Sequence, residues 1–429
     1  MKNKNHTFNC YNYFINVYKL NQKISQINDD RINPTVKLPA IILTIIFSLM
    51  SGLHSFHSME EAIRDGDFDK FFANIKLPSA DTFAYSLMSI NLDDLRKLAA
   101  DIIQKARYNK SLNNNLIDGL KVVAIDGTHV FTMRSDSLGK DAHKYEHTDE
   151  NEKITSIDYR EKAIAASYVG EGFSPLLKIN RIPKGEGEMT AAKKLVKELN
   201  KDHHQYCDVI VGDSLYINAP FINEVLRNNK DVIVRVKQKN NLMRKDAEGL
   251  FKNRKADHIY KNVSPQDEDK TSGMFYDIEI WDEEKFDWSD VNSSLRILKV
   301  KERKKQVNAD GEIVQEETQV CYFATTMEKG QLKAFTVWKI AHRRWDEESI
   351  FHWLKTHWNF ARRYSHNPHV IQAMFYLYVI AYNLFHLYIH RNLRSFNPEK
   401  ETKKKFLRRF YKGLITLRKP LYYPGISPG

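Results

Sequence analysis

Two short apolar runs, each ending in an aspartate, place the strongest constraint on the fold of this chain. Residues 121–126 read KVVAID and residues 207–213 read CDVIVGD, and both are rich in Val or Ile. Runs of this length and composition predict buried strands, and the amphipathic segment 188–199 between them predicts a helix. Strands that alternate with helices indicate an α/β sheet, whose ligands bind at the carboxyl ends of the strands. Asp126 and Asp213 are therefore expected at one edge of the sheet.

The pattern changes several times along the rest of the chain. Residues 132–158 are polar and rich in His, which predicts a surface loop. Alternating residues within 241–335 predict a β-rich insertion. Short helices within 36–115 suit either a helix-turn-helix-like DNA-binding unit or a plain packing domain. We expect five parts: a helical N-terminal DNA-binding domain (1–115), the first part of the α/β core (116–240), the insertion (241–335), the last core helices (336–395) and a basic C-terminal tail (396–429).

The charge balance indicates a polyanionic partner. The 429 residues carry a formal net charge of +12, and such an excess most often serves nucleic-acid binding, with a membrane surface as the competing interpretation. The three cysteines are widely separated and match neither a zinc site nor a disulfide framework. This usage fits a reducing compartment, and we expect a cytoplasmic protein.

Two apolar segments must be weighed as membrane spans. Residues 38–53 hold an apolar run shorter than the ~20 residues that a spanning helix needs. Residues 370–389 are long enough, but Gln372, Asn383 and His386 would be costly at the centre of a bilayer. Both segments are therefore predicted to be buried helices, and no membrane partner is expected.

A third carboxylate is expected from residues 341–358, which have helical periodicity. Arg344, Glu348 and Lys355 are spaced by four and seven residues, so all three can lie on one helix face. A solvated salt-bridge face would have the same spacing. If Glu348 instead meets the two strand-end aspartates, the three carboxylates repel one another unless a cation joins them. Mg²⁺ or Mn²⁺ takes such oxygen ligands, and a pair of these ions supports phosphodiester chemistry.

These residues carry a family resemblance. The spacing Arg344-x3-Glu348-x6-Lys355 fits the Y-x2-R-x3-E-x6-K signature of a group of bacterial insertion-sequence transposases with a DDE triad. The segments AIDGTH at 124–129 and VGDSLY at 211–216 resemble the two Asp motifs of that group. The signature's Tyr would fall at Ala341, and His342 or Tyr364 could replace its contact with a terminal phosphate.

The resemblance implies an RNase H-like α/β fold, a mixed sheet flanked by helices, with the β-rich insertion before the last catalytic helix. It implies that Asp126, Asp213 and Glu348 are catalytic and bind two Mg²⁺ or Mn²⁺ ions. The implied partners are double-stranded DNA, both transposon ends and target, and a second copy of the chain. The resemblance also implies a bacterial, nucleoid-associated protein. The alternative is a transposase-derived DNA-binding protein without catalytic activity. Residues expected to hold DNA phosphates are Arg344, Lys355, His342, Arg343 and Lys237, and candidates to stack on a flipped base during hairpin formation are Trp281, Tyr322 and Phe323.

Overall fold

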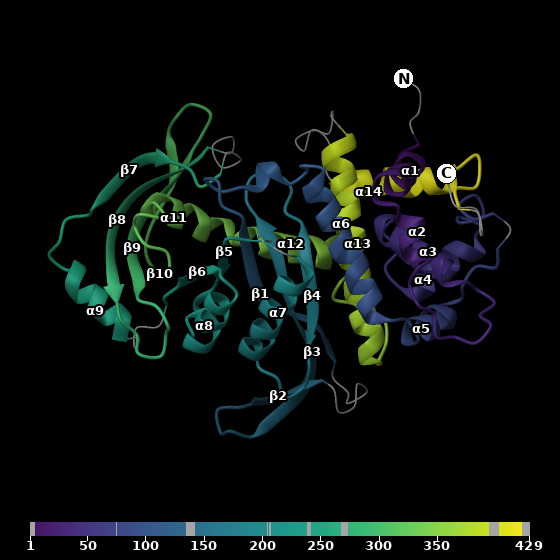
Figure 1. Ribbon diagram of the computed structural model, residues 1–429, viewed down its shortest axis with the longest axis horizontal. Helices are drawn as coiled ribbons and strands as arrows, with labels where there is room; N and C mark the ends of the chain where they lie inside the picture. The colour runs from purple at the N-terminus through teal and green to yellow at the C-terminus, as the bar shows by residue number, and fades with distance from the viewer. Residues whose placement is uncertain are drawn as a thin grey trace.

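A mixed β-sheet is the central element of the protein (Figure 1). The computed structural model describes residues 5–73, 75–133, 142–203, 205, 207–237, 242–266, 273–393 and 403–422. Within these residues ten strands join in the order β2-β3-β1-β5-β6-β10-β9-β8-β7, with β4 also paired to β3. The strands are β1 (Val122–Met133), β2 (His143–Thr148), β3 (Ile154–Val169), β4 (Leu176–Ile182), β5 (Val209–Gly212), β6 (Asp231–Arg235), β7 (His258–Val263), β8 (Met274–Phe286), β9 (Leu295–Val307) and β10 (Ile313–Thr325).

The central five strands have the RNase H-like arrangement that was predicted. Strands β4, β3 and β1 are antiparallel neighbours, whereas β5 and β6 run parallel to β1. In the β1–β5 register Val122 lies opposite Val209 and Ala124 lies opposite Val211. Because the two strands run in the same direction, Asp126 lies beside Asp213 at the carboxyl end of β5. The predicted fold class is therefore confirmed.

The insertion continues the core sheet. Strands β7 to β10 form an antiparallel meander, and β10 pairs with β6 through Phe323 and Arg235. Two charged side chains lie buried inside it: Asp282 accepts two hydrogen bonds from the guanidinium of Arg296, at 2.8 and 2.7 Å. The insertion is thus rigidly attached to the strand that follows the second aspartate.

Residues expected to form a surface loop build a projecting β-ribbon instead. We use this name for residues 127–133 of β1, β2 itself and residues 154–162 of β3 (Figure 1). The prediction of a loop at 132–158 was wrong for the described residues, because polar residues on both faces conceal the two-residue strand period. Residues 134–141 lie outside the described residues.

Helices cover the sheet and form a separate lobe at one end (Figure 1). Helix α6 packs on α13, and α14 packs on α1, so the two ends of the described chain share one hydrophobic core. The helices are α1 (His6–Tyr18), α2 (Leu20–Ile24), α3 (Leu38–Met50), α4 (Phe56–Arg64), α5 (Ala80–Met88), α6 (Leu92–Tyr108), α7 (Glu188–Asp202), α8 (Ala219–Arg227), α9 (Leu242–Phe251), α11 (Ala334–Arg343), α12 (Trp345–His357), α13 (Pro368–Asn392) and α14 (Lys403–Ile415).

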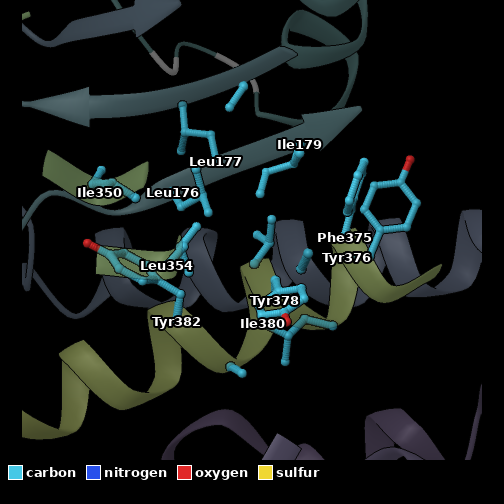
Figure 2. Packing of buried hydrophobic residues seen from close by; sticks show 14 of the residues in the cluster. Leu176, Leu177, Ile179, Ile350, Leu354, Phe375, Tyr376, Tyr378, Ile380 and Tyr382 are labelled. Atoms are coloured by element: carbon cyan, nitrogen blue, oxygen red, sulfur yellow. The ribbon is translucent and has the colours of Figure 1, made fainter. Parts of the chain in front are cut away.

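Helix α13 joins the helical lobe to the sheet. It is long and apolar enough to cross a membrane, yet 94% of its most apolar window is buried inside the protein. Figure 2 shows Leu176 and Ile179 of β4 facing this helix, with Leu354 of α12 beside them. Asn383 satisfies its buried amide by exchanging hydrogen bonds with the backbone of Leu176, at 3.0 and 2.6 Å. The predicted burial of residues 370–389 is confirmed.

Candidate active site

Asp126 lies in β1 at the point where the strand leaves the core. Residues 122–125 before it are fully buried, and its own side chain is 22% exposed. The next residue is Gly127, where a Cβ atom would lie 2.3 Å from the carboxyl carbon of Glu188. The Glu188 carboxyl thus packs directly against the backbone at Gly127, and any side chain at this position would displace it.

Asp213 follows β5 and caps the short helical turn after it. Its carboxylate accepts a hydrogen bond from the backbone N–H of Leu215 at 2.7 Å, which fixes the side chain at the strand end. Tyr216, in the same turn, is buried and donates its hydroxyl to Glu188 at 3.0 Å. A Cβ at Gly212 would collide with the Tyr216 ring at 2.8 Å, so the GDSLY sequence builds this turn around the tyrosine.

Glu188 is a fourth carboxylate that sequence reasoning missed. It begins α7, so its place in the GEGE sequence, directly before a predicted helix, was the available signal. A helix N-terminus favours an acidic side chain, and this preference offers a purely structural explanation for such a residue. Its contact with the Gly127 backbone adds it to the site.

Arg344 connects the first aspartate to the third carboxylate. Its guanidinium lies 3.9 Å from the Asp126 carboxylate and 2.7 Å from that of Glu348. Residues 341–358 were expected to form one helix, but α11 ends at Arg343 and α12 begins at Trp345, with Arg344 between them. Arg344 keeps helical dihedral angles, so the predicted contact between positions 344 and 348 survives the junction.

Lys355 reaches the same strand from the last turn of α12. Its ammonium donates a hydrogen bond to the Thr128 hydroxyl at 2.7 Å, two residues beyond Asp126. Burial lowers the pKa of Lys355, and the nearby Asp126 carboxylate opposes this effect. The predicted helix face therefore points at β1.

The carboxylates hold an excess of negative charge. Burial raises the pKa of Asp126 to about 6; Arg344 opposes that rise, while Asp213, Glu188 and Glu348 add to it. Burial also raises the pKa of Glu188, and Asp213 reinforces the effect. The oxygen donors suit a hard divalent ion, which would relieve this repulsion.

Arg344 supplies the positive charge within the cluster. Among the described residues, no three His, Cys, Asp or Glu side chains form a group that could hold a metal ion as they are arranged. Glu348 turns toward the guanidinium. The oxygen donors thus fit a metal site chemically. In the present arrangement the Arg344 guanidinium offsets part of the negative charge of the carboxylates.

Glu347 differs sharply from its neighbour Glu348. It is fully buried, and among the described residues neither of its carboxyl oxygens has a hydrogen-bond partner. Burial raises its pKa well above the usual range, and the nearby Asp126 adds to the effect. Because a buried carboxyl without hydrogen bonds costs free energy, this environment disfavours the charged form of Glu347. The sequence offers two adjacent glutamates and gives little indication of which one points inward.

A cavity of about 540 Å³ opens between the carboxylates and the insertion. Its lining includes the predicted residues Asp126, Asp213, Glu348, Arg344, His342 and Lys237. Arg235 of β6 lines it too, and the sequence did not single out this residue. The wall is fixed by Glu302, which is buried and accepts hydrogen bonds from Trp338 at 2.8 Å and from His342 at 2.9 Å. Most of the predicted site residues therefore meet at one cavity.

Arg343 must be corrected from a phosphate-binding residue to a structural one. Its side chain is 5% exposed and pairs with Asp346 at 2.8 Å. It also donates to the backbone oxygen of Gly170 and to the Gln266 side chain. The residue lies in the last turn of α11, where its charge also stabilises the helix end. Arg343 and Arg344 are adjacent in the sequence and were assigned the same role, but consecutive residues of a helix point in different directions.

Of the aromatic candidates, Phe323 alone lines the described cavity. Tyr322 precedes it on β10 and lies on the opposite face of the sheet. The Trp281 indole donates a hydrogen bond to the backbone oxygen of Arg254 at 2.7 Å. Stacking on a base within the cavity is thus restricted to one of the three candidates.

Ala341 also lines the cavity, where the signature has its Tyr. Tyr364 was one expected replacement, but it does not line the cavity, and its hydroxyl hydrogen-bonds that of Tyr378 at 3.0 Å. His342 does line it, beside Tyr276, with ring centroids 5.3 Å apart. His342 is therefore the better placed of the two expected substitutes.

Comparison with known proteins decides the family. Residues 118–384, more than half of the chain, match the model of the transposase DDE domain. The chain belongs to the DDE transposase family. The matched span contains Asp126, Asp213 and Glu348. No curated protein sequence matches the chain.

One solved structure resembles this DDE transposase at low similarity. It is a cryo-EM structure of a piggyBac transposase synaptic complex with hairpin DNA. The two chains share 12% sequence identity with a TM-score of 0.42, over 95% of this chain and 80% of the other.

Proposed function

We propose that the protein is an active DNA transposase that binds the terminal inverted repeats of an insertion sequence and catalyses metal-dependent strand cleavage and strand transfer. The observation that carries this proposal is the convergence of Asp126, Asp213 and Glu348 on one cavity, with Arg344 between two of them. Membership of the DDE transposase family supports the reaction class. The net charge of +12 supports DNA as the partner.

Asp126, Asp213 and Glu348 would hold Mg²⁺ or Mn²⁺, because these ions prefer carboxylate oxygens. Two such ions, when bound, make a water more nucleophilic and stabilise charge on the leaving oxygen of a phosphodiester. The raised pKa of Asp126 supports this assignment, since an additional cation would lower the repulsion that raises it.

The basic residues of the site would orient the DNA strand. The Arg344 guanidinium, which donates to Glu348 in this structure, would be able to make paired hydrogen bonds to a phosphate. Lys355 is held in place by Thr128 and offers a second positive charge next to Asp126. His342 and Lys237 extend this charge along the cavity wall.

The cavity supports excision through hairpin DNA ends, because a hairpin turn needs space for a base that has left the stack. Phe323 lies in its wall and offers a ring for that base. We further propose that two copies bridge two transposon ends, that a helical N-terminal domain aids recognition of the ends, and that the protein acts on DNA in the cytoplasm.

Incubating the full-length protein with Mg²⁺ and DNA carrying the inverted repeats that flank its gene tests the proposal. Wild-type protein should cleave at the repeat ends. Asp126→Asn should lower the cleavage rate by roughly 10³-fold or more, since metal coordination supplies several kcal/mol of transition-state stabilisation. DNA binding by the variant should persist. Wild-type protein that binds the repeats and leaves both strands intact would refute the enzymatic part.

A DNA-binding protein without catalysis is the second candidate. The observation that favours it is Ala341 in place of the signature's Tyr. Restoring that residue as Ala341→Tyr separates the two. A catalytically silent wild-type protein that gains cleavage with this substitution would support the second candidate.

A further inference from the structure

The β-ribbon carries an accumulation of cations that the proposed reaction does not use. In its register His129 lies opposite Lys162, and His143 lies opposite Arg160. Directly opposed residues of antiparallel strands point to the same face. Tyr145, two residues after His143, shares that face. We call the surface made by His129, His143, Tyr145, Arg160 and Lys162 the ribbon face.

Two cations of the ribbon face sit on a single aromatic ring. The Arg160 guanidinium lies 4.3 Å from the centroid of the Tyr145 ring, and the Lys162 ammonium lies 4.9 Å from it. The His129 ring is 6.1 Å away from the same ring. The tyrosine therefore fixes two like charges close together, although like charges at short range repel.

Among the described residues, few carboxylates on the ribbon face offset these cations. Asp158 is shared between His147 at 2.8 Å and Arg160 at 3.4 Å. Glu161 is buried on the other face of β3, where it pairs with Arg181 at 2.6 Å. Among the described residues, Lys162 forms no ion pair. An external anion is the partner that such a cluster of cations fits.

The ribbon face adjoins the carboxylate cluster on the side of Glu188. His129 follows Asp126 by three residues on β1, roughly 10 Å along a strand, and the odd spacing turns its side chain to the face opposite that of Asp126. That face is also the one on which the Glu188 carboxyl packs against Gly127. Burial, followed by the charges of Lys162 and Arg160, lowers the pKa of His129. Lys162 also acts on Glu188 of the cluster, against the stronger effect of burial. A chain of phosphates that passes the carboxylates would thus meet these cations next.

The shape of the ribbon suits the same partner. Residues 144–156 are mostly exposed, so this segment contributes little to the hydrophobic core. The hairpin of β2 and β3 at its end is two-stranded, and a two-stranded ribbon has the dimensions to lie along or within a groove of DNA.

We infer that the ribbon face binds the phosphate backbone of double-stranded DNA next to the catalytic carboxylates, through Arg160, Lys162 and His129, with Tyr145 holding the first two in place. The inference rests on the proposed function, and it adds a DNA-binding surface on the side of the carboxylates away from the insertion. The phosphates belong either to the transposon end or to target DNA.

The test uses full-length protein carrying Arg160→Gln and Lys162→Gln together. Binding is measured by fluorescence anisotropy on two duplexes of equal length, one with the terminal repeat and one of unrelated sequence, over a series of salt concentrations. Losing two phosphate contacts should weaken binding roughly tenfold or more and make the slope of log K against log salt shallower by about 1.8. Loss on the repeat duplex alone assigns the face to transposon ends, and loss on both assigns it to DNA irrespective of sequence.

A matched control removes equal charge elsewhere. Lys201→Gln with Lys252→Gln neutralises two exposed lysines outside the ribbon and should leave the salt slope unchanged. Tyr145→Phe should preserve binding because the ring remains, whereas Tyr145→Leu should weaken it. A ribbon double variant with native circular dichroism and an unchanged salt slope overturns the inference, while cleavage by wild-type protein would still support the proposed function.

Discussion

The two sides of the carboxylate cluster differ in how their charges are paired. On the insertion side, buried charged groups have close partners: Asp282 pairs with Arg296, and Glu302 accepts hydrogen bonds from His342 and Trp338. On the ribbon side, Arg160 and Lys162 share the Tyr145 ring; Arg160 also pairs with Asp158 at 3.4 Å, and Lys162 forms no ion pair among the described residues. The comparison indicates that the insertion gives the cavity its form, and it agrees with the inference that the ribbon face attracts DNA.

The carboxylate cluster between these sides holds an excess of negative charge. Arg344 lies against Asp126 and Glu348, and the neighbouring carboxylates Asp213 and Glu188 add to the repulsion on Asp126. Stability and function should therefore respond differently to substitution in each region.

The largest effect on stability is expected from Glu302→Ala in the insertion wall. The change leaves Trp338 and His342 without their buried acceptor, which should lower the free energy of unfolding by about 3 kcal/mol. Urea denaturation measures this loss. The matched control is Glu316→Ala, on β10 of the same insertion, whose carboxylate pairs with Arg303 at the exposed surface. Equal losses of unfolding free energy for Glu302→Ala and Glu316→Ala would show that the buried carboxylate of the cavity wall contributes no more than an exposed one.

A pH-dependent effect of similar size is expected at Asp126. Its pKa of about 6 exceeds the ordinary value of 3.8, so the native state binds the proton more tightly than the unfolded state. Its contribution to stability is then fully present below about pH 4 and is lost as pH rises through 6. Without divalent ions, Asp126→Asn should match wild type near pH 4 and exceed it by up to about 3 kcal/mol at pH 7.

Urea denaturation at several pH values, with a chelator and then with Mg²⁺, checks this expectation. Added Mg²⁺ should stabilise the wild type at pH 7 and narrow the gap to Asp126→Asn. A difference in unfolding free energy between wild type and Asp126→Asn that is constant over pH would show that the surroundings do not raise the pKa of the Asp126 carboxyl.

Glu347→Leu should give a smaller gain. Removing a buried carboxyl that has no hydrogen-bond partner should raise the free energy of unfolding by about 2 kcal/mol, and cleavage should persist. Glu348→Leu is the matched control, because that carboxylate is 45% exposed and faces Arg344; it should alter stability little and abolish cleavage. If Glu347→Leu abolished cleavage and Glu348→Leu preserved it, Glu347 would be the third catalytic carboxylate.

The smallest change in stability is expected on the ribbon. Arg160→Gln with Lys162→Gln should shift the free energy of unfolding by less than about 0.5 kcal/mol, because neither residue supports the core. Thermal unfolding, monitored by circular dichroism, measures it. A large loss would assign the ribbon cations to folding and would remove the contrast with the insertion wall.

The sequence predicted the core of this molecule well because burial leaves a periodic trace. The runs that end at Asp126 and Asp213 became adjacent parallel strands, and the spacing of Arg344, Glu348 and Lys355 placed all three toward β1. Local pattern and strand order were enough for these residues.

The failures have a common physical origin. The β-ribbon was taken for a loop because polar residues occupy both of its faces, and Arg343 was assigned to phosphate because its burial depends on the distant Gly170 and Gln266. Glu188 joins the site through a contact with Gly127, which lies 61 residues away along the chain. The tertiary contacts themselves leave no local signal, and the position of Glu188 at the start of a predicted helix is equally consistent with a purely structural role.

The attachment of the insertion through β10 and β6 also sets an order of folding. Asp126 and Asp213 precede the insertion along the chain, whereas Glu348 follows it, so the third carboxylate arrives only after β10 has been synthesised. Pairing between segments so far apart is slow compared with local helix formation. A ribosome-bound chain that has emerged as far as β6 would hold Asp126 and Asp213 without Glu348. The three carboxylates can therefore meet only after nearly all of the core has been made.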